Sequence, residues 1–292
     1  MTPVDMEKSA ECMMVLQTAS DEKQNKCPYC RGYGYEFFYY QPPDYPPGCS
    51  PIEYAEKCRR CGGKNGNYIE NNKNRLKLPY YSGLSAFNPS AYIGADNKPI
   101  SFKNEYTFIK QFVENFEEIE KETDIKGIYI YSKTGGNGKT FLASCICFEM
   151  FNKHHLMPLY IRENSLLEEL KKTVSDSQLS PRENLKRAQI LFIDDLWSRK
   201  TGRDWVDDEL FDIIDYRYTQ KLPTIITSNV PLSSPEINKR IASRLDEMCA
   251  PIRIPDVEIR DKKKVENRKA LLAKLREKDA ERNKDEAEDA DK

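Results

Sequence analysis

The feature that most constrains the fold is a glycine-rich stretch, IYSKTGGNGKTF, at residues 130–141. It follows the short apolar run GIYIY (127–131) and leads into a helix-like pattern that begins near Lys139. Its last part matches the pattern G-x-x-x-x-G-K-[ST], in which a strand, a loop and a helix N-terminus surround phosphate groups. Lys133 stands where that pattern has its first glycine. Because that glycine mainly eases the turn out of the strand, the stretch still predicts a phosphate-binding loop.

The residue types of this loop suit a nucleoside triphosphate. Backbone N–H groups would wrap the phosphates at the helix N-terminus, where the helix dipole favours negative charge. Lys139 would reach the β- and γ-phosphates, and the Thr140 hydroxyl would bind Mg²⁺. The candidate nucleotide-binding residues of the loop are Gly135, Gly136, Asn137, Gly138, Lys139 and Thr140. The alternative interpretation is a plain glycine-rich turn between a strand and a helix.

Short apolar runs predict the strands of one sheet: GIYIY (127–131), PLYI (158–161), QILFI (189–193), PTIIT (223–227) and PIRI (251–254). Helical patterns separate these runs, and a further helical face precedes them in FIKQFVENFEEI (108–119). Strands that alternate with helices of this length favour a parallel sheet with both faces covered. The sequence therefore predicts an α/β fold with a five-stranded parallel sheet.

Polar side chains follow two of these runs. Asp194 and Asp195 end ILFIDD, and Asn229 ends PTIITSN. In a parallel sheet the carboxyl ends of the strands share one edge, where ligands bind. Asp194 would hold Mg²⁺, Asp195 would polarise an attacking water, and Asn229 would orient that water near the γ-phosphate. Because an aspartate is shorter than the glutamate usual at the second acidic position, we expect slow hydrolysis. Taken alone, each segment also fits a buried strand with polar residues at its end.

Basic residues on the last predicted helix allow two interpretations. Arg240 and Arg244 lie four residues apart and share one helix face. They can pair with neighbouring acidic residues as part of a solvated face. In an oligomeric ATPase, an arginine at this place can instead reach the γ-phosphate bound by a neighbouring subunit. Arg260, after the last apolar run, is a candidate phosphate contact from its own chain.

Two CxxC pairs near the N-terminus predict a zinc site. CPYC (27–30) and CRRC (58–61) are separated by 27 residues, and each pair can place two thiolates on one tetrahedral ion. The candidate zinc ligands are Cys27, Cys30, Cys58 and Cys61. The surrounding segment is dense in Cys, Gly, Pro and Tyr, a composition that needs a staple to hold a small core. The alternative is two redox-silent pairs without a metal.

Composition divides the chain into segments. We expect a flexible N-terminus at 1–26, a zinc-binding module at 27–66, a linker at 67–100, an ATPase domain at 101–261 and a charged C-terminal tail at 262–292. The net charge is −1, so any contact with nucleic acid must come from a local basic patch. No apolar run approaches the ~20 residues that span a membrane. The N-terminus lacks the pattern of a signal peptide, so we expect a cytoplasmic protein.

Four strings together are more specific than a phosphate-binding loop alone: GIYIYSKTGGNGKTFLAS, ILFIDDLW, WVDDELFDIIDYRYTQKLPTIITSN and KRIASRLDE. They resemble the AAA+ ATPases of the DnaC/DnaI helicase-loader group, which includes the IstB transposition helpers. The resemblance covers a little over half of the chain and implies ATP and Mg²⁺ as cofactors. It implies Lys139 and Thr140 in the Walker A motif, Asp194 and Asp195 in Walker B, Asn229 as sensor 1, Arg244 as the arginine finger and Arg260 as sensor 2.

The resemblance implies a helicase loader. The zinc module would bind a hexameric replicative helicase, and the ATPase domain would bind ATP, single-stranded DNA and further copies of itself during replication initiation. Two alternatives remain. An IstB-like transposition helper would bind duplex DNA and deliver a transposase, although the cysteine module argues against it. A non-hydrolysing zinc adaptor with an AAA+ fold would bind a partner without turnover, an alternative that Lys133 favours.

Overall fold

The computed structural model describes residues 35–40, 52–57, 76–175, 181–198, 204–260, 268–269 and 271–276. The first two ranges are strands β1 (Tyr35–Tyr40) and β2 (Ile52–Lys57), which pair antiparallel. The candidate zinc ligands Cys27, Cys30, Cys58 and Cys61 lie outside the described residues. Most of the expected C-terminal tail also lies outside them.

A five-stranded parallel sheet forms the centre of the molecule, with strand order β4-β5-β6-β3-β7. The strands are β3 (Gly127–Tyr131), β4 (Pro158–Arg162), β5 (Ile190–Leu196), β6 (Thr224–Ser228) and β7 (Cys249–Arg253). The prediction of an α/β fold with this sheet is confirmed. Strand β6 lies between β3, which leads into the glycine-rich loop, and β5, which carries the two aspartates.

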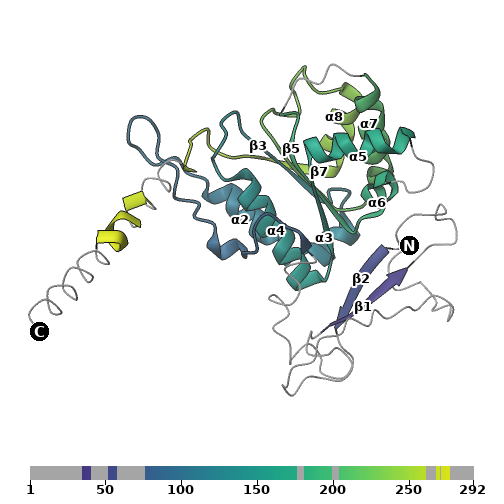
Figure 1. The fold of residues 1–292 in the computed structure, drawn as a ribbon, viewed down its shortest axis with the longest axis horizontal. Coiled ribbons are helices and arrows are strands. Elements are labelled where there is room, and N and C mark those ends of the chain that lie inside the picture. Colours follow the sequence, from purple (N-terminus) through teal and green to yellow (C-terminus); the bar gives the residue numbers. More distant parts are fainter. Residues whose placement is uncertain are drawn as a thin grey trace, which may run out of the picture.

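Helices cover both faces of the sheet (Figure 1). They are α2 (Lys103–Glu114), α3 (Phe116–Glu122), α4 (Lys139–His154), α5 (Glu163–Ser175), α6 (Pro181–Arg187), α7 (Asp204–Thr219) and α8 (Lys239–Met248). Neighbouring residues of a strand face opposite sides, so Ile128 and Ile130 pack with α2, α3 and α4, whereas Tyr129 packs with α5 to α8. Among the described residues, none of the helices is both long and apolar enough to span a membrane.

Residues 76–100, the described part of the segment expected to be a linker, pack into the core. Leu76, Leu78, Phe87 and Tyr92 are each exposed by 5% or less and join the core that α2 to α4 form. A short 3-10 helix, η2 (Leu84–Ala86), interrupts the segment. The apolar residues of segment 76–100 follow neither a helical nor a strand period, because their spacing is set by the surface that they cover.

The helical face expected at residues 108–119 is divided between two helices. Asn115 separates α2 from α3, and both its backbone N–H (2.9 Å) and its Nδ2 (3.0 Å) donate to the Gln111 carbonyl. The side chain thereby satisfies a carbonyl at the end of α2, a common role for a polar residue at a helix terminus. Phe112 and Phe116 are buried as the pattern predicts, whereas Phe108 is 42% exposed.

Candidate nucleotide-binding site

The glycine-rich loop joins the end of β3 to the first turn of α4. Its positive φ angles fall on Gly136 (+71°) and Gly138 (+97°), where any other residue would be strained. Lys133, which replaces the first glycine of the sequence pattern, is not among the described residues with positive φ. The missing glycine therefore removes no backbone freedom that this loop uses.

The segment after β7 contacts the outer side of the loop. The backbone N–H of Lys133 donates to Asp256 Oδ1 at 2.8 Å. The Gly136 carbonyl accepts from the N–H groups of Ile259 and Arg260, both at 3.1 Å. These contacts fix the loop from outside and place Arg260 beside it.

Lys139 is buried at the centre of the loop, with 4% of its surface exposed. Its Nζ donates to the carbonyl oxygens of Thr134 (2.9 Å) and Ser132 (3.4 Å) and to Asn137 Oδ1 (3.3 Å). Burial lowers the pKa of Lys139, and nearby aspartates, Asp195 first among them, oppose that change. An ammonium held mainly by neutral oxygens has its charge available for a phosphate group.

Four elements of the fold meet at Asp194, which is fully buried. Its Oδ1 accepts from the hydroxyls of Thr140 on α4 (2.8 Å) and Thr227 on β6 (2.6 Å). Its Oδ2 accepts from the Tyr160 hydroxyl on β4 (3.2 Å) and lies 3.6 Å from Arg162 Nε. Thr140 and Asp194 thus bring a hydroxyl and a carboxylate oxygen together, and oxygen ligands are those that Mg²⁺ prefers.

Tyr160, Arg162 and Thr227 were not predicted as site residues. Arg162 ends β4 and Thr227 is the last residue but one of β6, whereas Tyr160 lies in the middle of β4. The signal that selected Asp194, a polar residue where an apolar strand ends, could have found Arg162, but not Tyr160 or Thr227, which lie within their strands.

Asp195 follows Asp194 with a left-handed backbone conformation, at φ +58°. Its backbone N–H donates to Thr227 Oγ1 at 2.9 Å. Burial raises the pKa of the Asp195 carboxyl and Asp194 raises it further, whereas nearby cations, including Lys139 and Arg260, lower it. A partly buried carboxyl with a perturbed pKa, next to cations, is a candidate acid–base group.

Asn229 comes directly after β6, at the same edge of the sheet. Its side-chain Oδ1 is buried, and it accepts no hydrogen bond within the part of the chain that the structure describes. A buried acceptor without a donor costs stability, so it commonly marks a place that a ligand or an ordered water completes.

Arg244 lies on a surface formed by α7 and α8. Its Nε donates to Asp215 Oδ1 at 2.8 Å, and its guanidinium lies 4.6 Å from the centre of the Tyr218 ring. Arg240 lies 3.8 Å from the centre of the Phe211 ring. These contacts join both arginines to α7 of their own chain, so they do not place Arg244 against the glycine-rich loop.

The zinc prediction concerns Cys27, Cys30, Cys58 and Cys61. Within the described ranges, no group of three or more His, Cys, Asp or Glu side chains could hold a metal ion. Because all four candidate cysteines lie outside those ranges, the zinc site stays a prediction.

Parts of the chain are similar to known proteins. Residues 113–250 match the family described as the bacterial DnaA ATPase domain. The replicative helicase loader DnaI of Bacillus subtilis (strain 168) is 32% identical over 127 residues, which cover 42% of this chain and 39% of DnaI. The resemblance to AAA+ ATPases of the DnaC/DnaI type is confirmed.

Two further comparisons extend over more of the chain. The protein XkdC of the phage-like element PBSX, also from Bacillus subtilis (strain 168), is 24% identical over 162 residues, 53% of this chain and 59% of XkdC. A crystal structure of the DnaC helicase loader aligns with a TM-score of 0.49 and 23% identity, over 62% of this chain and 99% of that chain. The chain thus spans 59% and 39% of the lengths of XkdC and DnaI.

Proposed function

We propose that this protein is an ATP-dependent helicase loader, which binds a hexameric replicative helicase and single-stranded DNA during replication initiation. The observation that carries the proposal is the convergence of Lys139, Thr140 and Asp194 at one edge of the sheet. It offers an ammonium, a hydroxyl and a carboxylate to the triphosphate and its metal ion. The identity to the loader DnaI, 32% over 127 residues, supports a helicase as the partner.

The glycine-rich loop would hold the phosphates of ATP. Gly138 is the N-cap of α4, and the N–H groups of the first helical turn have no carbonyl partner inside the helix. They lie at the positive end of the helix dipole, which stabilises bound anions. Lys139 would exchange its contacts to loop oxygens for contacts to phosphate oxygens. Thr140 and Asp194 would hold Mg²⁺, which neutralises charge on the phosphates.

Hydrolysis requires a water molecule that is oriented and gives up a proton. In the proposed role, the Asp195 carboxylate polarises this water, and its raised pKa makes it a better base. The unpaired Oδ1 of Asn229 accepts a hydrogen bond from the same water. An aspartate reaches less far than a glutamate, so we expect slow turnover.

Turnover would depend on a neighbouring copy of the chain. Arg244 would exchange its contact with Asp215 for the γ-phosphate held by the next subunit, while Arg260 acts from its own chain. The cost of breaking the Arg244–Asp215 pair is small, because both side chains are more than a third exposed and such pairs contribute little. ATP would thereby favour the assembled state, and hydrolysis would release it.

The N-terminal module would bind Zn²⁺ through its four cysteines and contact the helicase. The pairing of Tyr35 with Lys57 supports this part of the proposal. It brings together the chain that follows the first cysteine pair and the chain that precedes the second. In the sequence, Tyr35 follows Cys30 by five residues and Lys57 directly precedes Cys58.

The proposal is tested by measuring ATP turnover by the purified protein alone, with single-stranded DNA added, and with the replicative helicase of the same organism added. We expect slow basal turnover that changes when DNA or helicase is added. Lys139→Ala should abolish nucleotide binding and serves as the control for contaminating ATPases. Tight binding of ATP without turnover under any of these conditions would overturn the proposal and support the non-hydrolysing adaptor.

A further inference from the structure

The turn after Asp194 contains two residues in a backbone conformation that residues other than glycine seldom adopt. Asp195 has a φ of +58° and Trp197 a φ of +59°. Aspartate tolerates the left-handed region better than most residues, but a bulky tryptophan there is an outlier. The Ser198 N–H donates to the Asp195 carbonyl at 3.1 Å and closes the turn. Such a conformation persists only where its surroundings hold it in place.

Strand β6 holds the first half of this turn. Thr227 Oγ1 accepts from the Asp195 N–H at 2.9 Å, and Ser228 Oγ donates to the Leu196 carbonyl at 2.8 Å. Both contacts come from the neighbouring strand, and they restrain the Asp195 N–H and the Leu196 carbonyl but not the peptide groups that follow.

Glu163, the first residue of α5, holds the second half. Its Oε1 accepts from the Trp197 N–H at 2.9 Å. Its Oε2 accepts from the Ser198 N–H at 3.1 Å and from the Ser198 hydroxyl at 2.5 Å. Glu163 is buried, with 4% of its surface exposed, so rotating these peptides would leave a buried carboxylate without its donors.

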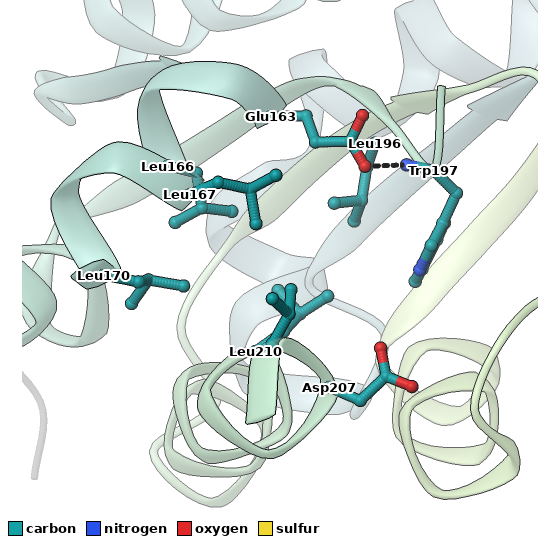
Figure 2. Close-up of a pocket in the computed structure, with 9 residues that line it drawn as sticks. Glu163, Leu166, Leu167, Leu170, Leu196, Trp197, Asp207 and Leu210 are labelled. Atoms are coloured by element: carbon teal, nitrogen blue, oxygen red, sulfur yellow. Dashed lines mark hydrogen bonds between the residues drawn. The ribbon is translucent and has the colours of Figure 1, made fainter. Parts of the chain in front are cut away.

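A small pocket lies beside the turn, so side chains pack against only part of it. Figure 2 shows the Glu163–Trp197 hydrogen bond on one side of the pocket and Asp207 and Leu210 of α7 on the other. Leucines of α5, including Leu166, line a third side. The Trp197 ring packs against the core, with its centre 6.2 Å from that of Tyr129, while the hydrogen bonds to Glu163 hold the backbone of the second half of the turn.

A simpler explanation for Glu163 is its place in the first turn of a helix. An acidic side chain is stabilised there by the helix dipole and by the free N–H groups of its own helix. The three hydrogen bonds described above, however, all come from the turn after β5. The carboxylate therefore connects α5 to the end of the strand that carries Asp194 and Asp195.

We propose that Glu163 is a positioning residue for hydrolysis: by fixing Trp197 and Ser198, it keeps Asp195 in its left-handed conformation and so directs the Asp195 carboxylate. This inference rests on the proposed function, in which Asp195 polarises the attacking water. Glu163 acts through Asp195 and touches neither ATP nor the metal ion. Loss of its carboxylate should therefore lower kcat and leave the affinity for ATP unchanged.

Glu163→Gln tests this role with a side chain of the same shape. Glutamine offers one acceptor oxygen, and its amide group would face one of the N–H groups of the turn. We expect kcat to fall by at least about tenfold, within the range of a misplaced general base. The matched control is Glu149→Gln on α4, where Oε1 accepts from the Leu84 N–H at 3.2 Å. The control should leave both kcat and ATP affinity unchanged.

Ser198→Ala is the second variant, for the case that Glu163→Gln does not fold. It removes the hydroxyl contact and keeps both backbone donors to Glu163, so kcat should fall less and ATP affinity should not change. An unchanged kcat in both variants would overturn the proposal. A loss of ATP affinity that accounts for the whole loss of turnover would also overturn it.

Trp197 reports on the turn directly. The chain has 2 tryptophans, so Trp205→Phe leaves Trp197 as the one source of tryptophan fluorescence. In that background Glu163→Gln should increase the quenching of Trp197 by acrylamide. If the wild-type protein binds ATP and never hydrolyses it, the proposed function fails, and this quenching alone decides on the restraint. Increased quenching then supports the restraint, and unchanged quenching overturns it.

Discussion

Lys133 occupies the place of a glycine without adopting a glycine's backbone conformation. Positive φ angles in the loop fall on Gly136 and Gly138, and the Lys133 N–H donates to Asp256. We predict that Lys133→Gly leaves ATP affinity unchanged and lowers the free energy of unfolding by roughly 0.4–1 kcal/mol, because glycine makes the unfolded chain more flexible. ATP titration and urea denaturation measure the two quantities. Tighter ATP binding by this variant would contradict the prediction.

Gly136→Ala is the contrasting substitution within the same loop. Gly136 has a φ of +71°, and a Cβ there would lie 2.8 Å from Glu258 Oε1. Alanine at this place should distort the loop and weaken ATP binding. Comparing the two variants thus distinguishes Gly136, whose backbone conformation the loop requires, from position 133, where the sequence pattern has a glycine that this loop does not need.

The contacts of Asp194 show which residues of a site a sequence reveals. Asp194, Asp195 and Asn229 were selected because a polar residue stands out after an apolar strand. Thr227 lies inside strand β6, where threonine is a common strand former and carries no such signal. Its hydrogen bonds to both aspartates depend on the strand order, which places β6 next to β5. Strand order is a property of the whole sheet and leaves no local pattern in the sequence.

The strands and helices whose apolar residues recur with a regular period were predicted from the sequence. The packing of the irregular segment 76–100 was not. The five strands begin within two residues of the apolar runs that predicted them. Residues 76–100 bury Phe87 and Tyr92 against the helices on one face of the sheet, yet they contain little regular structure. The Tyr92 hydroxyl even donates to the Asn137 carbonyl of the glycine-rich loop at 3.0 Å. A period can reveal a helix or a strand, but not an irregular segment that follows the surface beneath it.

The segment after β7 makes a contact whose strength should depend on pH. The hydrogen bond from Arg253, first of all, lowers the pKa of Asp256 to about 2, and bonds from Ser132 and Lys133 add to the effect. In the unfolded chain an aspartate titrates near ~3.9. The ionised carboxylate therefore stabilises the fold fully above that pH, and its contribution is lost as the pH falls toward the folded pKa.

We therefore predict a pH-dependent difference between the wild-type protein and Asp256→Asn. The difference in the free energy of unfolding should be constant near neutral pH and should shrink below about pH 4. Urea denaturation at a series of pH values measures it. A difference that stays the same across that range would mean that the carboxylate charge is not what holds this segment.

For the whole molecule, the decisive question is whether Arg244 acts on its own chain or on a neighbour. In the single chain it pairs with Asp215 and lies over Tyr218. If it completes the site of a neighbouring subunit, Arg244→Ala should leave the ATP affinity of the single chain unchanged. It should lower assembly-dependent turnover by at least about tenfold, since arginines in this role contribute that much or more. Turnover per subunit should rise with protein concentration in the wild type and stay flat in the variant.

Mixing two inactive variants decides between the two positions of Arg244. Arg244→Ala keeps an intact nucleotide site, and Lys139→Ala keeps an intact Arg244 but should not bind ATP. In a mixed assembly, a Lys139→Ala subunit can supply Arg244 to the site of an Arg244→Ala subunit, so the mixture should regain turnover that neither variant has alone. If Arg244 acts on its own chain, no mixed assembly contains a complete site and the mixture stays inactive. Because the outcome depends on which chain each residue comes from, it also tests whether the site is shared between subunits at all.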